Sequence, residues 1–244
     1  MTKLGLDYPT EWGRRAHMRA IRGLLYRWWI APYMRYTASL DVRGLANIAA
    51  PGPLIFVANH TSNLDTPLIL SSLPPTVRRK TVVAAAMDSF FTNARTAFRT
   101  VLLFNAIPFD RLSLNRRSAQ QALELVREGW NLLIYPEGGR TTDGNLGDFK
   151  GGAAYLAERS HATVIPTYVH ESGYLKGPKY AKAPQFVQSP SQSRHRVIVT
   201  FGEPLFALDG ESIRRYGSRI ERAVIDLGRQ VSGDPLYGDR TEDD

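Results

Sequence analysis

Apolar residues recur along the chain in two patterns, short continuous runs and longer stretches with helical spacing. Short runs are typical of strands buried on both faces, whereas spacing of three and four residues predicts a helix with one buried side. Because the two patterns alternate, we predict an α/β fold, a layered mixed sheet flanked by helices. We expect strands over residues 36–42, 54–58, 81–85, 105–109, 132–135, 163–169 and 196–201.

Helical spacing occupies the stretches between these strands. Pro74 and Pro75 are expected to end one helix, because proline cannot continue the hydrogen-bond pattern. The clearest helix has apolar residues at helical spacing before a glycine in the position of a C-terminal cap, namely Ala119, Ala122, Leu123, Val126 and Gly129. Further helices are expected over residues 11–36 (one or two helices), 65–72, 86–103, 153–159 and 213–227.

The length of 244 residues suits one large domain or two small ones. With 43% apolar and 22% charged residues, the chain can build a hydrophobic core. We predict an N-terminal basic and aromatic segment over residues 1–37, one domain over 38–232 and a polar tail over 233–244.

The chain contains no cysteine, which excludes disulfides, cysteine-ligated zinc and thiol catalysis. His161, His170 and His195 lack the spacing of metal ligands, so we predict no metal site. The net charge of +8 favours a polyanion, an anionic membrane or a small phosphorylated substrate, without choosing among them.

The N-terminal segment combines arginines with large apolar side chains. Its longest apolar stretch, residues 24–34, is interrupted by Arg27 and Pro32, so we predict no transmembrane helix. Basic residues and tryptophans on one helix suit the headgroup layer of a membrane, although the aromatic side could instead pack on the protein body. The residues concerned are Arg14, Arg15, Arg19, Arg22, Arg27 and Arg35 with Leu24, Leu25, Trp28, Trp29 and Tyr33.

The candidate catalytic pair is His60 and Asp65. His60 follows the apolar run 54–58, and Asp65 comes five positions later, at a predicted helix start with Pro67 in the first turn. A carboxylate near an imidazole can hold one ring tautomer and make the other nitrogen a general base. The alternative is that Asp65 only caps the helix and His60 only satisfies a loop.

Four sequence blocks occur in order between about residues 40 and 205. They are Asn59-His60 with Asp65, Ile107-Pro108-Phe109-Asp110-Arg111, Tyr135-Pro136-Glu137-Gly138-Gly139-Arg140-Thr141, and Val164-Ile165-Pro166-Thr167. The third continues as Asp143-Gly144 and Phe149-Lys150-Gly151-Gly152. Together they resemble the glycerolipid acyltransferase family, that of the bacterial lysophosphatidate acyltransferases.

The resemblance implies an enzyme that moves a fatty acyl group from acyl-CoA or acyl-carrier protein to the free hydroxyl of 1-acylglycerol 3-phosphate, making phosphatidic acid. It implies that His60 is the general base, that Asp65 orients and charges it, and that no acyl-enzyme forms. Ser62 beside His60 is an alternative nucleophile, but it lacks a placed base. The chain also has no Gly-x-Ser-x-Gly elbow.

The resemblance also implies substrate-binding residues in the second and third blocks. Arg111 follows a predicted strand, where α/β sheets collect ligands, and its guanidinium suits a phosphate; a salt bridge to Asp110 or another acid is the alternative. Glu137 is expected to organise its loop and bond an acceptor hydroxyl, while Gly138 brings backbone amides close to a ligand. Arg140 and Lys150 are expected to add positive charge for the phosphate.

The chain departs from the family pattern at three positions. Tyr135 replaces phenylalanine, Gly139 replaces threonine, and Asn105 stands where glycine is common. The first two changes remove no charge. The change at Asn105 leaves the local backbone and the choice of acceptor open.

The partners expected are an anionic membrane surface, acyl-CoA and a glycerol-phosphate lipid. We expect no cofactor besides the acyl donor, no nucleic acid, no obligate protein partner, and a peripheral position on the cytoplasmic face of the cell membrane. The alternatives are a glycerol-3-phosphate or other lyso-lipid acyltransferase, a noncatalytic lipid-surface binding protein, and a nucleic-acid binder. The last lacks any recognisable nucleic-acid motif.

Overall fold

The structure is a computed structural model that describes residues 5–111, 116–140, 146–174 and 195–233. In these ranges, seven strands form one sheet in the order β1-β7-β6-β2-β5-β3-β4. Neighbouring strands are parallel except β6 and β7, so the predicted mixed sheet is confirmed. The strands are β1 (Ala38–Arg43), β2 (Leu54–Ala58), β3 (Thr81–Ala86), β4 (Ala106–Phe109), β5 (Asn131–Ile134), β6 (Thr163–His170) and β7 (His195–Phe201).

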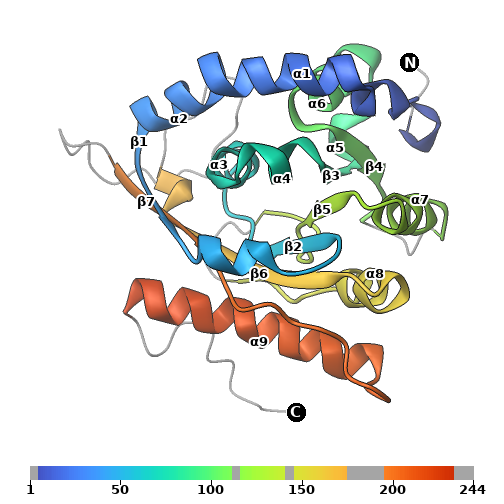
Figure 1. The fold of residues 1–244 in the computed structure, drawn as a ribbon, viewed down its shortest axis with the longest axis vertical. Coiled ribbons are helices and arrows are strands. Elements are labelled where there is room, and N and C mark those ends of the chain that lie inside the picture. The colour runs from blue at the N-terminus through green and yellow to red at the C-terminus, as the bar shows by residue number, and fades with distance from the viewer. Residues whose placement is uncertain (1–4, 112–115, 141–145, 175–194, 234–244) are drawn as a thin grey trace.

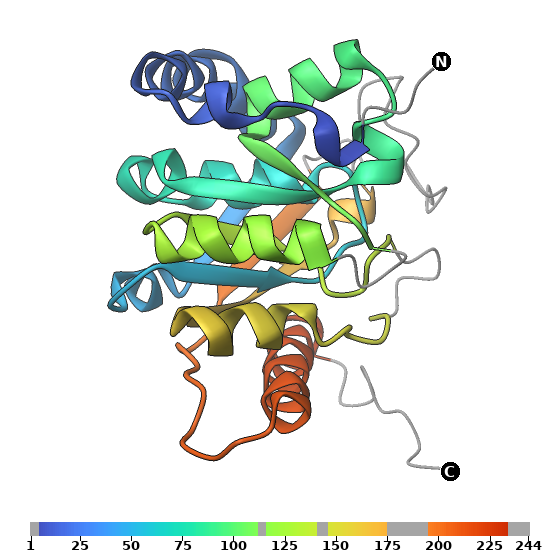
Figure 2. The same cartoon turned by 90° about the vertical axis from the view of Figure 1, so that its right-hand side faces the viewer.

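Helices cover both faces of this sheet (Figures 1 and 2). The α-helices are α1 (Ala16–Leu25), α2 (Ala31–Thr37), α3 (Asp65–Ser72), α4 (Pro75–Arg79), α5 (Met87–Phe90), α6 (Ala94–Phe104), α7 (Arg116–Arg127), α8 (Gly152–Ser160) and α9 (Ile213–Ser232). The short 3₁₀ segments are η1 (Gly5–Asp7), η2 (Glu11–Arg14), η4 (Leu45–Ala49) and η5 (Ser172–Tyr174), and η3 (Tyr26–Ile30) is a π-helical turn.

The alternation of side chains along each strand divides the core into two clusters. Phe56 and Leu133 face one cluster, which α3 and α6 cover, and Phe201 packs edge-on against Phe56 in that cluster. Ile55 and Leu132 face the other cluster, which α7, α8 and α9 cover. Adjacent residues of a strand therefore supply opposite faces, as a sheet buried on both sides requires.

Some predicted boundaries were wrong, each for a local reason. Tyr36 and Thr37 belong to α2 and not to the first strand; the Thr37 hydroxyl donates to the Tyr33 carbonyl 3.1 Å away, at the end of the helix. Asn105 is no strand residue but the cap of α6, with φ of 54° in the left-handed region that asparagine tolerates. Pro75 does more than break a helix, because it begins α4.

The N-terminal helices α1 and α2 are joined by the π-helical turn; α1 lies outside α4 and α6, and α2 lies against α3 (Figure 1). Arg22 anchors this layer, because its buried guanidinium donates to the carbonyls of Gly13, Val101 and Leu102 at 2.9–3.0 Å. Burial lowers the pKa of Arg22 to about 10. Arg22 is thus buried and joins α1 to η2 and α6, and it is not one of the membrane-facing arginines that the sequence predicted.

The sheet brings the candidate residues to one edge. Strands β6, β2, β5, β3 and β4 run parallel, so their carboxyl ends lie along the same edge. His60 follows β2, Arg111 follows β4, and Glu137 follows β5. This edge is where open α/β sheets bind ligands.

Candidate active site

His60 and Asp65 form a direct pair. The His60 Nδ1 atom lies 2.9 Å from the Asp65 Oδ2 atom, and the Asp65 side chain is fully buried. The same Oδ2 atom accepts hydrogen bonds from the backbone N–H groups of Thr61 and Ser62, each at 2.8 Å. The Ser172 hydroxyl donates to the other oxygen, Oδ1.

These contacts correct one prediction. Asp65 begins α3, but its side chain caps no helical N–H; Leu64 occupies the N-cap position. The carboxylate instead faces back into the loop that carries His60. The interpretation of Asp65 as only a helix cap is therefore wrong.

The hydrogen bonds assign the imidazole tautomer. The Asp65 carboxylate already accepts from three other donors, so it is the acceptor toward His60. The proton of that bond then belongs to Nδ1, which leaves the Nε2 lone pair of His60 available as a base. His60 also lines the main cavity.

Tyr135 stacks on a face of the His60 ring. The two rings stack with centroids 4.1 Å apart and planes inclined by 21°. The Tyr135 hydroxyl lies 2.8 Å from the Thr66 hydroxyl, and burial together with the nearby Asp65 charge raises the pKa of Tyr135. The tyrosine at this family phenylalanine position thus keeps the ring and gains a polar anchor on α3.

Glu137 organises the loop, as the sequence predicted. Its Oε1 atom accepts from the His60 backbone N–H at 2.7 Å, and its Oε2 atom accepts from the Gly147 N–H at 2.7 Å. One carboxylate therefore joins the loops after β2 and β5. Its expected bond to an acceptor hydroxyl stays a prediction, because Glu137 is absent from the lining of the cavity.

Arg111 lies on the cavity wall in a hydrogen-bonded fork. Its Nε and Nη2 atoms donate to the two carboxylate oxygens of Asp88 at 3.1 and 2.7 Å. Its Nη1 atom donates to the Gly138 carbonyl at 2.9 Å. The ion-pair alternative thus describes this structure, although the partner is Asp88 and not Asp110.

Gly138, Arg140 and Lys150 surround Arg111 in different ways. Gly138 has φ of 72°, and a Cβ atom there would lie 2.8 Å from the Lys150 Nζ atom, so only glycine fits without displacement. Lys150 donates to the Arg111 carbonyl at 2.7 Å and does not line the cavity. Arg140 lines the cavity together with Gly139.

The cavity has a volume of about 740 Å³ and is lined by two chemically different sets of residues. The polar set contains His60, Asn63, Thr66, Ser89, Arg111, Tyr135, Gly138, Gly139 and Arg140. The other lining residues are almost all apolar: Val83, Ala84, Ala85, Ala86, Phe90, Thr100, Phe104, Ala106, Phe109 and Ile134. The volume is in the range of sites for small molecules.

Several of these contacts were not found from the sequence. Asp88 and Ser172 belong to none of the four blocks, and no spacing pattern marks them. Ser62, considered as a nucleophile, is buried and its hydroxyl oxygen accepts from the Leu64 N–H at 3.2 Å. Residues 141, 143 and 144 of the third block lie outside the described residues.

Comparison with known proteins identifies the family to which the chain belongs. A family model described as Acyltransferase matches residues 39–170, more than half of the chain. The chain belongs to the acyltransferase family. All the lining residues of the cavity, together with His60 and Asp65, fall within the matched range, whereas Ser172 lies just beyond it.

Proteins named as acyltransferases resemble this chain at 24–31% identity. The 1-acyl-sn-glycerol-3-phosphate acyltransferase of Saccharomyces cerevisiae is 24% identical over 85% of this chain and 66% of the yeast protein. A probable enzyme of the same name from Mycoplasma pneumoniae is 27% identical over 62% of this chain and 56% of that protein. The lyso-ornithine lipid O-acyltransferase of Pseudomonas aeruginosa is 31% identical over 63% and 56% of the two chains.

This acyltransferase chain therefore spans only part of the length of these relatives. Among solved structures, the 1-acyl-sn-glycerophosphate acyltransferase PlsC of Thermotoga maritima superposes with a TM-score of 0.55 at 19% identity, over 86% of this chain and 78% of that one. At that identity the superposition supports the shared fold.

Proposed function

We propose that this protein transfers a fatty acyl group from a thioester to the free hydroxyl of a 1-acylglycerol 3-phosphate, forming phosphatidic acid. The observation that carries the proposal is the oriented His60–Asp65 pair, whose His60 lines a cavity that also has two arginines and many apolar residues in its lining. An anionic headgroup and an acyl chain are the two kinds of ligand that such a lining suits. Names of relatives support the same class of reaction.

The pair accounts for the proton transfer. His60 Nε2 removes the proton from the acceptor hydroxyl while the oxygen attacks the thioester carbonyl. The tetrahedral intermediate collapses, the carbon–sulfur bond breaks, and the leaving thiolate takes the proton from the imidazolium. Asp65 stabilises the imidazolium in between, so no covalent acyl-enzyme is needed.

Arg111 and Arg140 supply positive charge beside His60. An arginine guanidinium binds phosphate through paired hydrogen bonds, which fixes the acceptor as well as attracting it. Asp88 already occupies two donors of Arg111. The phosphate therefore either binds on the exposed side of that pair or replaces Asp88.

The experiment for the proposed function is an acceptor screen on the purified chain. Palmitoyl-CoA or palmitoyl-acyl-carrier protein is the donor, with 1-acylglycerol 3-phosphate, glycerol 3-phosphate and a lyso-lipid without phosphate as acceptors. Lipase digestion then reads the position acylated. We expect phosphatidic acid from 1-acylglycerol 3-phosphate; ester formation only with another acceptor would replace it as the substrate.

We further propose that the acyl chain occupies the part of the cavity lined by the apolar residues of β3, β4 and α6. Val83 and Ala106 pair in register, three residues before Ala86 and Phe109 at the carboxyl edge. Three residues of strand span roughly 10 Å, so the first pair lies deeper than the second. Small side chains on the deep part of β3 and β4 leave room for methylene groups, and α6 closes the far wall through Phe104.

A larger residue at Ala106 is expected to shorten the preferred acyl chain. Ala106→Leu adds volume to a fully buried wall position, and overpacking typically costs 1–3 kcal/mol, so activity with palmitoyl-CoA relative to octanoyl-CoA should fall on the order of tenfold. Ala106→Val should have a smaller effect in the same direction. Equal losses for both donors in a folded protein would mean that the acyl chain lies elsewhere.

The N-terminal helices present an apolar outer side that suits a membrane. Trp28 and Trp29 are 65% and 73% exposed, so their rings do not pack on the body as the alternative interpretation requires. We name this surface the N-terminal apolar face; its residues are Ile21, Leu24, Trp28, Trp29, Tyr33 and Tyr36. Within the described residues, no helix is both long enough and apolar enough to cross a bilayer.

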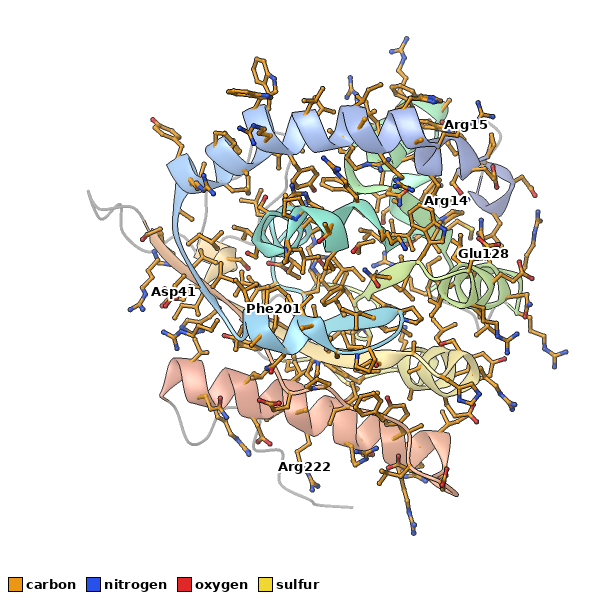
Figure 3. The ribbon with its side chains drawn as sticks, viewed as in Figure 1. Arg14, Arg15, Asp41, Glu128, Phe201 and Arg222 are labelled. Carbon is orange, nitrogen blue, oxygen red and sulfur yellow. The ribbon has the colours of Figure 1, made fainter. Side chains whose placement is uncertain are left out.

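Cations accompany this face. Arg15 at the N-cap of α1, Arg27 in η3 and Arg35 in α2 are exposed. Arg14, which Figure 3 labels near Arg15, is largely covered. Exposed apolar patches of this kind mark interaction surfaces, and tryptophan with arginine suits the headgroup layer of an anionic membrane. We therefore propose a peripheral position on the cytoplasmic face of the cell membrane.

Vesicle binding is expected to depend on both indoles and on salt. Each basic residue near an anionic surface contributes about 1 kcal/mol, which salt screens, while the indole contribution resists salt. Co-sedimentation with phosphatidylglycerol vesicles across a salt series measures both, using the full chain and the Trp28→Ala/Trp29→Ala variant. We expect strong binding in low salt that the double variant weakens.

The matched control is Phe206→Ala/Leu208→Ala, which removes two exposed apolar side chains beside α9 on the other side of the sheet. This control should bind vesicles like the unchanged protein. Unchanged binding of the tryptophan variant would contradict the role of the indoles. Equal binding to neutral and anionic vesicles would contradict the role of the arginines.

A further inference from the structure

Ser172 contacts the catalytic pair from a part of the chain outside the family blocks. It follows β6 at the start of η5, its side chain is fully buried, and its hydroxyl donates to the Asp65 Oδ1 atom. Among the hydrogen bonds found in the described residues, this is the contact made by Oδ1, whereas Oδ2 accepts from His60, Thr61 and Ser62. Ser172 therefore holds the side of the carboxylate that His60 does not reach.

The hydrogen-bond directions continue the chain one residue further. The Ser172 and Thr61 hydroxyls lie 2.9 Å apart. Ser172 has one proton and gives it to the carboxylate, so Thr61 is the donor in the second bond. The order of donation is thus Thr61 to Ser172 to Asp65, with His60 donating to the opposite oxygen.

The backbone around Ser172 is shaped to bring it there. Asn59, beside His60, pairs with the backbone of Val169: its Nδ2 donates to the Val169 carbonyl at 3.0 Å and its Oδ1 accepts from the Val169 N–H at 2.7 Å. Glu171 then has φ of 63°, a left-handed conformation uncommon for glutamate. Such a conformation persists where the surrounding structure requires it, and here it turns Ser172 under Asp65.

We propose that Ser172 is a positioning residue of the His60–Asp65 pair, with Thr61 as its own donor. The proposal rests on the proposed acyl transfer and deepens it. By donating to Oδ1, Ser172 fixes the plane of the carboxylate and thereby the direction of the His60 ring. It also offsets part of the buried negative charge of the Asp65 carboxylate.

Two effects of Ser172→Ala follow from this geometry. The turnover number should fall roughly 10- to 100-fold, the range for a hydrogen bond to a charged group. The KM values for donor and acceptor should change little, because Ser172 does not line the cavity. A turnover loss without a KM change separates positioning from substrate binding.

The pH–rate profile provides a second readout. Without the serine hydroxyl, the carboxylate attracts a proton to the pair more strongly, whichever atom receives it. The acidic limb of the turnover number should therefore move to higher pH, by about half to one unit. The other ionisable groups around the pair stay in place: Tyr135, Glu137, Arg111, Arg140, His170 and Glu171.

Three variants of the full chain test the proposal beside the active unchanged protein. Ser172→Thr keeps a hydroxyl and should restore the acidic limb toward its original pH. Thr61→Val keeps the backbone bond to Asp65 and should move the limb less than Ser172→Ala, in the same direction. Thr163→Val removes another buried hydroxyl at the far end of β6, bonded to the Pro51 carbonyl at 2.8 Å, and should leave the limb unmoved.

The outcomes separate this proposal from the proposed function. No acyl transfer by the unchanged protein would overturn both. Acyl transfer with an unmoved acidic limb in both Ser172→Ala and Thr61→Val would overturn the role of Ser172 alone. If Ser172→Ala does not fold, the limb of Thr61→Val decides.

Discussion

His60→Ala is expected to reduce acyl transfer by about 10² to 10⁴-fold while the protein stays folded, because this is the usual scale for a lost general base. His60 is joined to Asp65 at 2.9 Å and lies on the cavity wall, so its Nε2 atom is the base that the described site offers. The variant loses the stack on Tyr135 but keeps the Glu137 bond to the backbone N–H of residue 60, and Asp65 keeps its bonds to Thr61, Ser62 and Ser172. The loss should therefore appear in turnover more than in stability.

Steady-state thiol release with saturating donor and acceptor measures this change, and circular dichroism with a melting curve measures the fold. His161→Asn is the matched control, since His161 is an exposed histidine in the left-handed conformation that asparagine accepts. It should keep full activity. Near-normal turnover in folded His60→Ala would remove the proposed mechanism.

Arg111→Ala is expected to lower kcat/KM for the acceptor roughly 10- to 100-fold and to leave the donor KM nearly unchanged, because hydrogen bonds between charged groups are the ones lost. The guanidinium lies on the cavity wall near His60, where the acceptor headgroup is proposed to bind. Two-substrate kinetics, with each substrate varied in turn, give kcat/KM for the acceptor and KM for the donor separately. Arg222→Ala removes an exposed arginine of α9 (Figure 3) and controls for the loss of a surface charge.

Asp88→Asn distinguishes phosphate binding from a structural ion pair. The Asp88 carboxylate holds Arg111 through two hydrogen bonds. If the pair is only structural, Asp88→Asn and Arg111→Ala should cause similar losses. If Arg111 binds phosphate, Asp88→Asn should leave the acceptor KM unchanged or lower it. An Arg111→Ala variant in which only the KM for acyl-CoA changes would show that the phosphate assignment is wrong.

The contact between His60 and Asp65 was predictable because the two residues are close in sequence. His60 and Asp65 stand at the end of an apolar run and the start of a helix, and both boundaries follow from local patterns. The sheet and most of its strands follow from the same apolar periodicity. Even so, Asp65 bonds the loop and not the helix, because the side chain has a stronger partner in His60.

The surroundings of the pair were not predictable in this way. Ser172 is 107 positions from Asp65, and Asp88 is 23 positions from Arg111. No periodicity links such residues, and their contacts depend on which strands the sheet makes neighbours. Lys150 bonds the Arg111 carbonyl outside the cavity lining, a contact that no sequence pattern marks, and its role in phosphate binding stays a prediction.

Tyr135 and Asn105 show how departures from a family pattern acquire a physical explanation. The tyrosine ring stacks on His60 as a phenylalanine ring would, and its hydroxyl finds Thr66. Asn105 adopts the positive φ that glycine allows, and its side-chain amide also donates to the Thr81 carbonyl at 3.0 Å. Neither geometry is visible in composition or spacing.

The central claim is that His60 drives direct transfer from a thioester to a phospholipid precursor. One assay tests it most directly, with palmitoyl-CoA and 1-oleoylglycerol 3-phosphate added together and separately, thiol measured by absorbance and phosphatidic acid by mass spectrometry. We predict equal amounts of thiol and phosphatidic acid, formed only when both substrates are present and lost in His60→Ala. Thiol release that needs no acceptor, or that continues unchanged in folded His60→Ala, would contradict the claim.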